Sequence, residues 1–174
     1  VLFFDPFPPY MVRGEGCHLW DADGHRYLDA LGEYTAGLYG HSDPAIRAAV
    51  SEALHSGLSL SSQTERESLL ARELQRRFPS MELLRFTNSG TEANLMALAT
   101  ATAVTERRKV LVFKGAYHGG VLAFGQGGSP VNVPYEWVVA RYNDLEDVRA
   151  QVAAHGKDLA AILVEPMLGS GGCI

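Results

Sequence analysis

Cysteine and metal-ligand patterns are scarce in this sequence. Its 174 residues include two cysteines, Cys17 and Cys173, and neither belongs to a CxxC motif or a histidine-rich segment. This count fits neither a disulfide framework nor a zinc site, so we expect two reduced thiols. The six histidines form no pair at metal-ligand spacing on a predicted helix face, and we therefore expect no metal site.

Positive charge and long apolar runs are also scarce. Fifteen Lys and Arg residues stand against twenty Asp and Glu, the formal net charge is −5, and there is no run of five basic residues. We therefore expect no nucleic-acid partner. The longest apolar stretches, such as residues 159–164, have only the length of a strand, and the first residues lack the pattern of a signal peptide. We expect a cytoplasmic protein with no membrane span.

The composition is that of a globular protein, with 47% hydrophobic and 20% charged residues. In the second half of the chain, short apolar runs alternate with amphipathic segments. The expected strands are 83–86, 109–113, 138–142 and 160–164, and the expected helices are 91–105 and 144–155. This alternation is typical of an α/β fold with a parallel sheet.

The first half of the chain begins with a predicted hairpin over residues 18–28. Its turn contains Asp23-Gly24, and the glycine supplies the positive φ that a tight hairpin turn requires. A helix should then start at Pro44, capped by Ser42 or Asp43, and should stop at Gly57.

A second helix of the first half should start after Thr64. Thr64 and Glu67 have the spacing of a capping box, and Pro79 forbids the helix to continue.

Ligands of open parallel sheets bind beyond the carboxyl ends of the strands, so the residues that follow strands are the candidates for function. The first such segment contains Ser89-Gly90-Thr91 at the start of a predicted helix. Unpaired backbone N–H groups, the helix dipole and the two hydroxyls could bind an anion there. The alternative is an ordinary N-cap at Ser89 or Thr91, which is common at any helix.

Two further segments follow predicted strands. Tyr117 and His118 stand among glycines, which allow a flat ligand to approach closely, and the tyrosine ring could stack on it. Taken by themselves, they favour the simpler interpretation of a loop tyrosine packed on its own surface and a histidine bonded to a carbonyl. Glu165 ends the last apolar strand, a place where a glutamate is usually solvated.

Taken together and in this order, the three segments resemble the class III pyridoxal-phosphate aminotransferases. Residues 89–93 resemble the phosphate-binding turn of that family, 117–119 its ring-stacking loop, and 164–166 the strand end that lines its cofactor pocket. Residues 20–29 and 40–44 also resemble its N-terminal hairpin and the start of its first helix. The resemblance implies a fold type I transferase, with 1–57 on the small-domain side and 58–174 forming the first half of the large domain.

The resemblance also implies a cofactor and its ligands. Pyridoxal 5'-phosphate would be held at its phosphate by Ser89, Gly90 and Thr91. Tyr117 would stack on its ring, His118 would orient the loop, and Glu165 would form the pocket floor. The implied partners are an amino acid, a 2-oxo acid and a second copy of the chain in a homodimer.

Within the family, residues 142–146 are similar to the glutamate-1-semialdehyde aminomutase branch. The stretch 120–125, however, is shorter than the mobile loop of those aminomutases, which favours a transaminase. Residues 31–38 and 117–122 are similar to the β-amino-acid (β-phenylalanine) aminotransferases of this branch. We therefore expect transfer of an amino group between an amino acid, for which an aromatic β-amino acid is a candidate, and a 2-oxo acid, with an aminomutase as the alternative.

No catalytic residue is assigned to these 174 residues. The resemblance implies a Schiff-base lysine and an aspartate at the ring nitrogen, both beyond Ile174, and a substrate-binding arginine upstream of Val1, as in a fragment of a longer enzyme. Lys109, Lys114 and Lys157 match no lysine context of the family.

The sequence leaves two alternatives of other classes. A non-catalytic aminotransferase-like module is compatible with a missing lysine. A nucleotide-binding domain would need a P-loop or a GxGxxG motif, which residues 125–128 do not supply.

Overall fold

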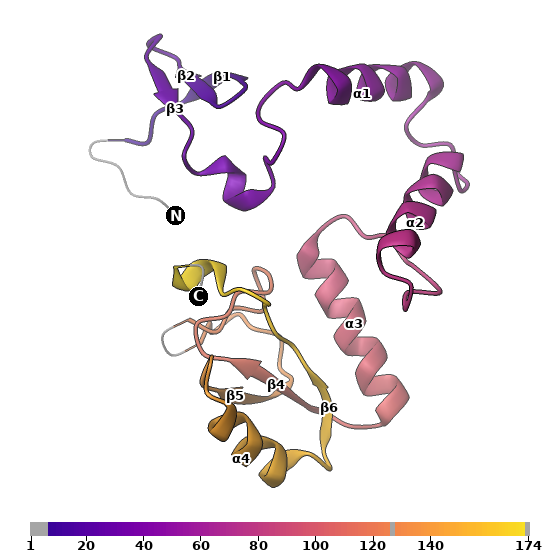
Figure 1. Cartoon of the computed structure of the whole chain (residues 1–174), viewed down its shortest axis with the longest axis vertical. Coiled ribbons are helices and arrows are strands. Elements are labelled where there is room, and N and C mark those ends of the chain that lie inside the picture. Colours follow the sequence, from indigo (N-terminus) through magenta and orange to yellow (C-terminus); the bar gives the residue numbers. More distant parts are fainter. Residues whose placement is uncertain (1–6, 126–127, 173–174) are drawn as a thin grey trace. The chain divides into compact units, whose positions relative to one another are not determined.

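The computed structural model describes residues 7–125 and 128–172, which form two compact units, Val1–Ser80 and Met81–Ile174 (Figure 1). Cys173, Ile174 and part of the glycine-rich loop at 125–128 lie outside the described residues. Within those ranges, no helix is long and apolar enough to cross a membrane.

The first unit begins with an antiparallel sheet. Its strands, in the order β1-β2-β3, are β1 (Met11–Glu15), β2 (His18–Asp21) and β3 (Arg26–Leu28). The hairpin expected over 18–28 is thus confirmed, and Gly24 has the required positive φ of 86°. Strand β1 is not predicted from the sequence, because its residues MVRGE show no alternation of apolar and polar side chains.

A buried carboxylate holds the turn between β2 and β3. Asp21 Oδ1 accepts hydrogen bonds from the backbone N–H groups of Asp23 and His25, at 3.0 and 2.8 Å, and Tyr27 donates its hydroxyl to Oδ2 at 2.6 Å. The hydrogen bond from Tyr27, more than any other cause, lowers the pKa of Asp21 to about 2. The carboxylate therefore stays ionised and keeps its acceptor role.

Both helices of the first unit agree with the prediction. Helix α1 (Pro44–Ser56) is capped by Asp43, whose Oδ1 accepts two backbone hydrogen bonds, and ends before Gly57 at φ 96°. Helix α2 (Glu65–Arg77) follows Thr64, whose backbone N–H donates to the Glu67 carboxylate at 3.1 Å. The cap chemistry in the sequence sets these bounds.

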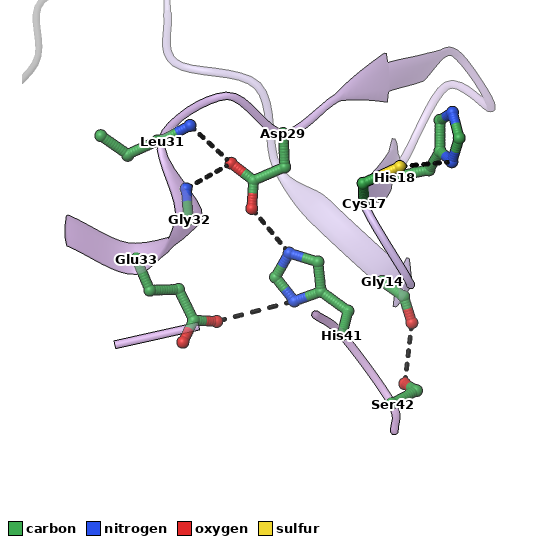
Figure 2. A network of polar contacts seen from close by, with 9 residues as sticks. All are labelled: Gly14, Cys17, His18, Asp29, Leu31, Gly32, Glu33, His41 and Ser42. Atoms are coloured by element: carbon green, nitrogen blue, oxygen red, sulfur yellow. Dashed lines mark hydrogen bonds and ion pairs between the residues drawn. The ribbon is translucent and has the colours of Figure 1, made fainter. Parts of the chain in front are cut away.

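A polar network joins the segment after β3 to the residues before α1 (Figure 2). Asp29 Oδ1 accepts from the backbone N–H groups of Leu31 and Gly32, both at 3.0 Å, and Asp29 Oδ2 lies 2.7 Å from His41 Nε2. His41 Nδ1 lies 3.6 Å from the Glu33 carboxylate. The N–H of Gly32, followed by the ring of His41, lowers the pKa of Asp29 below its ordinary value.

This network encloses a left-handed turn, the short helix η1 (Gly32–Thr35). Positive φ values, between 52° and 78°, occur at four consecutive residues: Gly32, Glu33, Tyr34 and Thr35. A left-handed conformation costs a non-glycine residue roughly 1–2 kcal/mol, so such strain persists only where neighbouring contacts enforce it. Asp29 and His41 supply these contacts, and sequence patterns gave no sign of the turn.

The second unit contains a three-stranded parallel sheet in the order β5-β4-β6. Its strands are β4 (Lys109–Phe113), β5 (Glu136–Ala140) and β6 (Leu159–Ile162), and its helices are α3 (Gly90–Thr105) and α4 (Leu145–His155). A further short helix, η2 (Gly169–Gly171), follows β6. The parallel α/β fold expected from the sequence is confirmed.

Strand β4 lies between the other two strands and forms the centre of the core. Val110, Leu111 and Val112 are fully buried, and Leu98 of α3 and Leu122 of the following loop are packed with them. A strand buried on both faces reads as a continuous apolar run, which is why its bounds match the prediction.

Three predicted strands need correction. Strand β5 occupies 136–140 rather than 138–142, and β6 occupies 159–162 rather than 160–164. Residues 83–86 form no strand, because no strand among the described residues pairs with them, and Leu83 is 95% exposed. Strand propensity gives a strand only where a partner takes up the backbone hydrogen bonds.

The left-handed turn yields a stability prediction at Tyr34, whose side chain is 72% exposed. Tyr34→Gly should be more stable than Tyr34→Ala by about 1 kcal/mol, because glycine removes the cost of positive φ while both variants lose the same exposed ring. Urea denaturation of the two variants measures the difference. Leu38, 83% exposed and outside the set of positive-φ residues, is the control, and there alanine should be the more stable. The same order at both positions would contradict the left-handed turn.

Candidate functional site

The three candidate segments meet in the second unit, at the start of α3 and in the loops after β4 and β6. Ser89 is the N-cap of α3, and its Oγ accepts from the N–H of Glu92 at 3.1 Å. The Glu92 carboxylate in turn accepts from the N–H of Asn88 at 2.7 Å. The capping role considered as the alternative for Ser89 is therefore present.

The cap leaves other groups at the start of α3 free to bind a ligand. Among the described residues, no acceptor lies in hydrogen-bonding position to the amides of Gly90 and Thr91. A Cβ placed on Gly90 would meet nothing within 4 Å, so the space on the side-chain side of its Cα is open. Two free amides at the positive end of a sixteen-residue helix suit an anion.

The loop after β4 packs directly on the start of α3. The N–H of Gly120 donates to Thr91 Oγ1 at 3.2 Å, and Asn94 Nδ2 donates to the carbonyl oxygen of His118 at 2.8 Å. Gly119 has φ 139°, and a Cβ there would lie 2.3 Å from Thr91 Oγ1, so this contact requires glycine. Since Thr91 Oγ1 acts as an acceptor here, its hydroxyl proton remains available to a ligand.

Asn94 is a residue that sequence reasoning missed. It lies three residues after Thr91 and therefore on the same face of α3, where neighbours at this spacing meet. This three-residue spacing from Thr91 is the feature of the sequence that points to Asn94.

Tyr117 and His118 are adjacent but have opposite environments. The Tyr117 side chain is 57% exposed, whereas His118 is 8% exposed. The Nε2 atom of His118 has no hydrogen-bond partner among the described residues. Burial lowers the pKa of His118 below its ordinary value of 6.5, with the Glu165 carboxylate opposing this shift. The imidazole is therefore neutral at pH 7, and its Nε2 atom lacks, among the described residues, a hydrogen bond that a further polar group could supply.

Glu165 is not the solvated strand-end residue that is usual at such positions. Its Oε1 accepts from the backbone N–H of Tyr117 at 2.7 Å, and its Oε2 accepts from the N–H of Gly169 at 3.2 Å. Its carbonyl oxygen accepts from the hydroxyl of Tyr142 at 2.8 Å. The bonds to Tyr117 and Tyr142 join residues that are remote from Glu165 in the sequence, and no motif points to them.

Among the described residues, no hydrogen bond or ion pair joins a lysine to any of the six candidate residues. Lys109, at the start of β4, is 3.1 Å from Asp158, and Lys157 follows α4. Lys114 borders an open apolar depression of about 500 Å³ that also involves Phe124 and Trp137. None of the six predicted cofactor ligands lines this depression, so its size does not make it the functional site.

Comparison with known proteins places the chain among aminotransferases. Residues 5–174 match the protein family described as Aminotransferase class-III. The β-phenylalanine transaminase of Variovorax paradoxus is 58% identical over 174 residues, which are 100% of this chain and 40% of that protein. A glutamate-1-semialdehyde 2,1-aminomutase of Dichelobacter nodosus is 40% identical over 96% of this chain and 42% of its own length. This chain thus spans about 40% of the length of the curated relatives it matches.

Solved structures show the same fold. The crystal structure of the β-phenylalanine aminotransferase from Variovorax paradoxus has a TM-score of 0.94 and 57% identity, over 99% of this chain and 40% of that one. A transaminase with PLP bound has a TM-score of 0.89 and 33% identity, over 99% and 44% of the two chains. The expected fold type I transferase fold, represented here in part, is confirmed.

The buried His118 predicts a pH dependence of stability. Its pKa is lowered in the folded state, so the unfolded chain binds the proton more tightly. The stabilising contribution is complete above pH 6.5, the ordinary value, and decreases as the pH falls below it. Between about pH 7.5 and pH 5, wild type should therefore lose more stability in urea denaturation than His118→Gln does. Equal losses, or an NMR titration midpoint of His118 at or above 6.5, would contradict this prediction.

Proposed function

The chain belongs to the class-III aminotransferase family, and we propose that the complete protein transfers an amino group between an amino acid and a 2-oxo acid, with pyridoxal 5'-phosphate as cofactor. The observation that carries the proposal is the 58% identity to a β-phenylalanine transaminase along the whole of this chain. The site geometry supports it, because the three family-like segments converge within one unit.

The residues at the start of α3 fit the phosphate of this cofactor. The free amides of Gly90 and Thr91 and the hydroxyls of Ser89 and Thr91 are donors at the positive end of the helix dipole. Tyr117, with its exposed ring, suits stacking on the pyridine ring. His118 offers a buried nitrogen that lacks a partner among the described residues, as expected of a site completed by further groups.

The cofactor, when bound, supplies an electron sink for the carbon that carries the amino group. The residues of this chain bind and orient it. Thr91 joins the helix start to the loop of Tyr117 through Gly120, and Glu165 fixes the same loop from the other side. We place the lysine that would move the proton, and the aspartate at the ring nitrogen, outside these 174 residues. Lys109 and Lys157 precede the residues of β4 and β6 that lead to the convergent loops, and Lys114 lines a depression that none of the six proposed cofactor ligands lines.

We propose an aromatic β-amino acid as the amino donor, on the strength of the Variovorax relative. The aminomutase relative, at 40% identity, supports isomerisation of glutamate 1-semialdehyde as the second candidate. We further propose a cytoplasmic homodimer, in which residues 1–57 belong to the small-domain side and residues 58–174 to the large domain.

Requirement for an acceptor separates the two reactions. The complete protein, loaded with pyridoxal phosphate, should convert more than one equivalent of β-phenylalanine per bound cofactor to its oxo acid only when a 2-oxo acid is added, with one new amino acid formed per oxo product in this turnover. Chromatography of both products measures this stoichiometry. Conversion of glutamate 1-semialdehyde with no acceptor, and no reaction of β-phenylalanine, would refute the transaminase and support the aminomutase.

Thr91 provides a test of the phosphate position. Thr91→Ala should weaken cofactor binding by about 1–3 kcal/mol, because a charge-assisted hydrogen bond is lost. Thr91→Ser is the control, since it keeps the hydroxyl that accepts from Gly120, and its affinity should stay near that of wild type. Equilibrium dialysis against pyridoxal phosphate gives the affinities. Unchanged binding in Thr91→Ala would exclude the proposed phosphate position.

A further inference from the structure

The loops that follow β4 and β6 are joined by two polar bridges. In the first, the Glu165 carboxylate accepts from Tyr117 N–H at 2.7 Å and from Gly169 N–H at 3.2 Å. In the second, Ser170 Oγ donates to the carbonyl oxygen of Gly115 at 2.8 Å. Both bridges connect the same two loops, but only the first one ends on the backbone of Tyr117.

Both carboxylate oxygens of Glu165 accept hydrogen bonds from the backbone. An ionised carboxylate is purely an acceptor, and each of its oxygens already takes one amide proton. Hydrogen bonds to an ionised acceptor are roughly twice as strong as those between neutral groups. Glu165 therefore fixes the main chain at residue 117, while Tyr117 as a residue remains 57% exposed, which leaves its side chain open to a ligand.

The main chain at Glu165 is in turn held by a hydrogen bond from a side chain after β5. Tyr142, just after β5, donates its hydroxyl to the Glu165 carbonyl oxygen at 2.8 Å. The Tyr142 ring packs edge-on against Phe113 of β4, with 5.8 Å between ring centroids. The main chain at Glu165, which follows β6, is thus linked to Tyr142 after β5 and, through the Tyr142 ring, to Phe113 of β4, so a shift of Tyr117 relative to this support requires breaking its hydrogen bond to the Glu165 carboxylate.

We propose that Glu165 is a positioning residue, which sets the place of the Tyr117 ring over the cofactor through the Tyr117 amide rather than by touching the cofactor. This inference rests on the proposed function, and it changes the role expected for Glu165 from a pocket floor to an anchor of the stacking loop. The bond to Tyr117 N–H, the second bond to Gly169 N–H and the exposure of the ring together carry it.

Glutamine cannot reproduce this anchor. Its side-chain amide has one acceptor oxygen, and its NH₂ group would face one of the two backbone N–H donors. Glu165→Gln should therefore weaken pyridoxal phosphate binding by about tenfold, as expected for the loss of one charge-assisted hydrogen bond. It should also change the visible circular dichroism of the bound cofactor, which reports the placement of the adjacent ring.

A double-mutant cycle tests whether Glu165 acts through the ring. Cofactor affinity and visible circular dichroism are measured for the complete protein with Tyr, Phe or Leu at position 117, each combined with Glu or Gln at position 165. Glu165→Gln should have its full effect with Tyr or Phe, where a ring remains to be placed, and less than about a twofold effect in Tyr117→Leu. Ser170→Ala, which breaks only the second bridge, should change the affinity less than about twofold.

Each other outcome overturns the inference. An equal loss of cofactor affinity on Glu165→Gln with Tyr, Phe and Leu at position 117 would mean that Glu165 touches the cofactor or supports the fold in general. No loss with Tyr at position 117 would mean that the Glu165 bond to the Tyr117 amide does not affect cofactor binding. A loss in Ser170→Ala equal to that in Glu165→Gln would assign the effect to loop bridging as such. If wild type bound no pyridoxal phosphate, the proposed function itself would fail, which distinguishes that failure from an unsuccessful cycle.

Discussion

Parallel pairing on both edges of β4 is the constraint on which the second unit depends. Because β5 and β6 both run parallel to β4, the segments after β4 and β6 emerge at the same edge of the sheet. This places Tyr117 and Glu165, which are 48 residues apart in sequence, within hydrogen-bonding distance. Helix α3 adds its N-terminus to the same place through Thr91. The convergence of the three segments is thus a consequence of strand direction, as the rule for ligand sites in open parallel sheets expects.

Sequence patterns predicted those elements whose ends are set locally. Asp43 and Gly57 bound α1, the pair Thr64 and Glu67 starts α2, and the fully buried run of β4 is recognised by its length. Sequence patterns failed where pairing with a distant segment decides whether a strand forms and where it ends. Residues 83–86 have strand-like composition but no paired strand in the described chain, and the ends of β5 and β6 depend on how far their pairing with β4 extends.

The candidate site shows the same division. The residue types at 89–91, 117–118 and 165 follow from family resemblance, but their contacts do not. Thr91 leaves no room for a side chain at position 119, and the Glu165 carboxylate accepts hydrogen bonds from two backbone amides. The spacing of residues in the sequence shows neither contact. Ser89 combines both interpretations considered for it, since its oxygen caps the helix while its hydroxyl proton remains available. A cap and an anion site use the same unpaired helix start, so one role does not exclude the other.

Three carboxylates in this chain perform one physical task in different settings. Asp21 holds a hairpin turn, Asp29 holds a left-handed turn, and Glu165 holds the loop of Tyr117, and each does so by accepting two backbone N–H groups. Loops lack the ladder that satisfies backbone donors in helices and sheets, and an ionised carboxylate replaces that ladder with two strong acceptors. The charge thereby imposes a conformation that local propensity alone would not hold. At Asp29 this conformation includes three non-glycine residues with positive φ, and at Glu165 it fixes the main chain beneath an exposed aromatic ring.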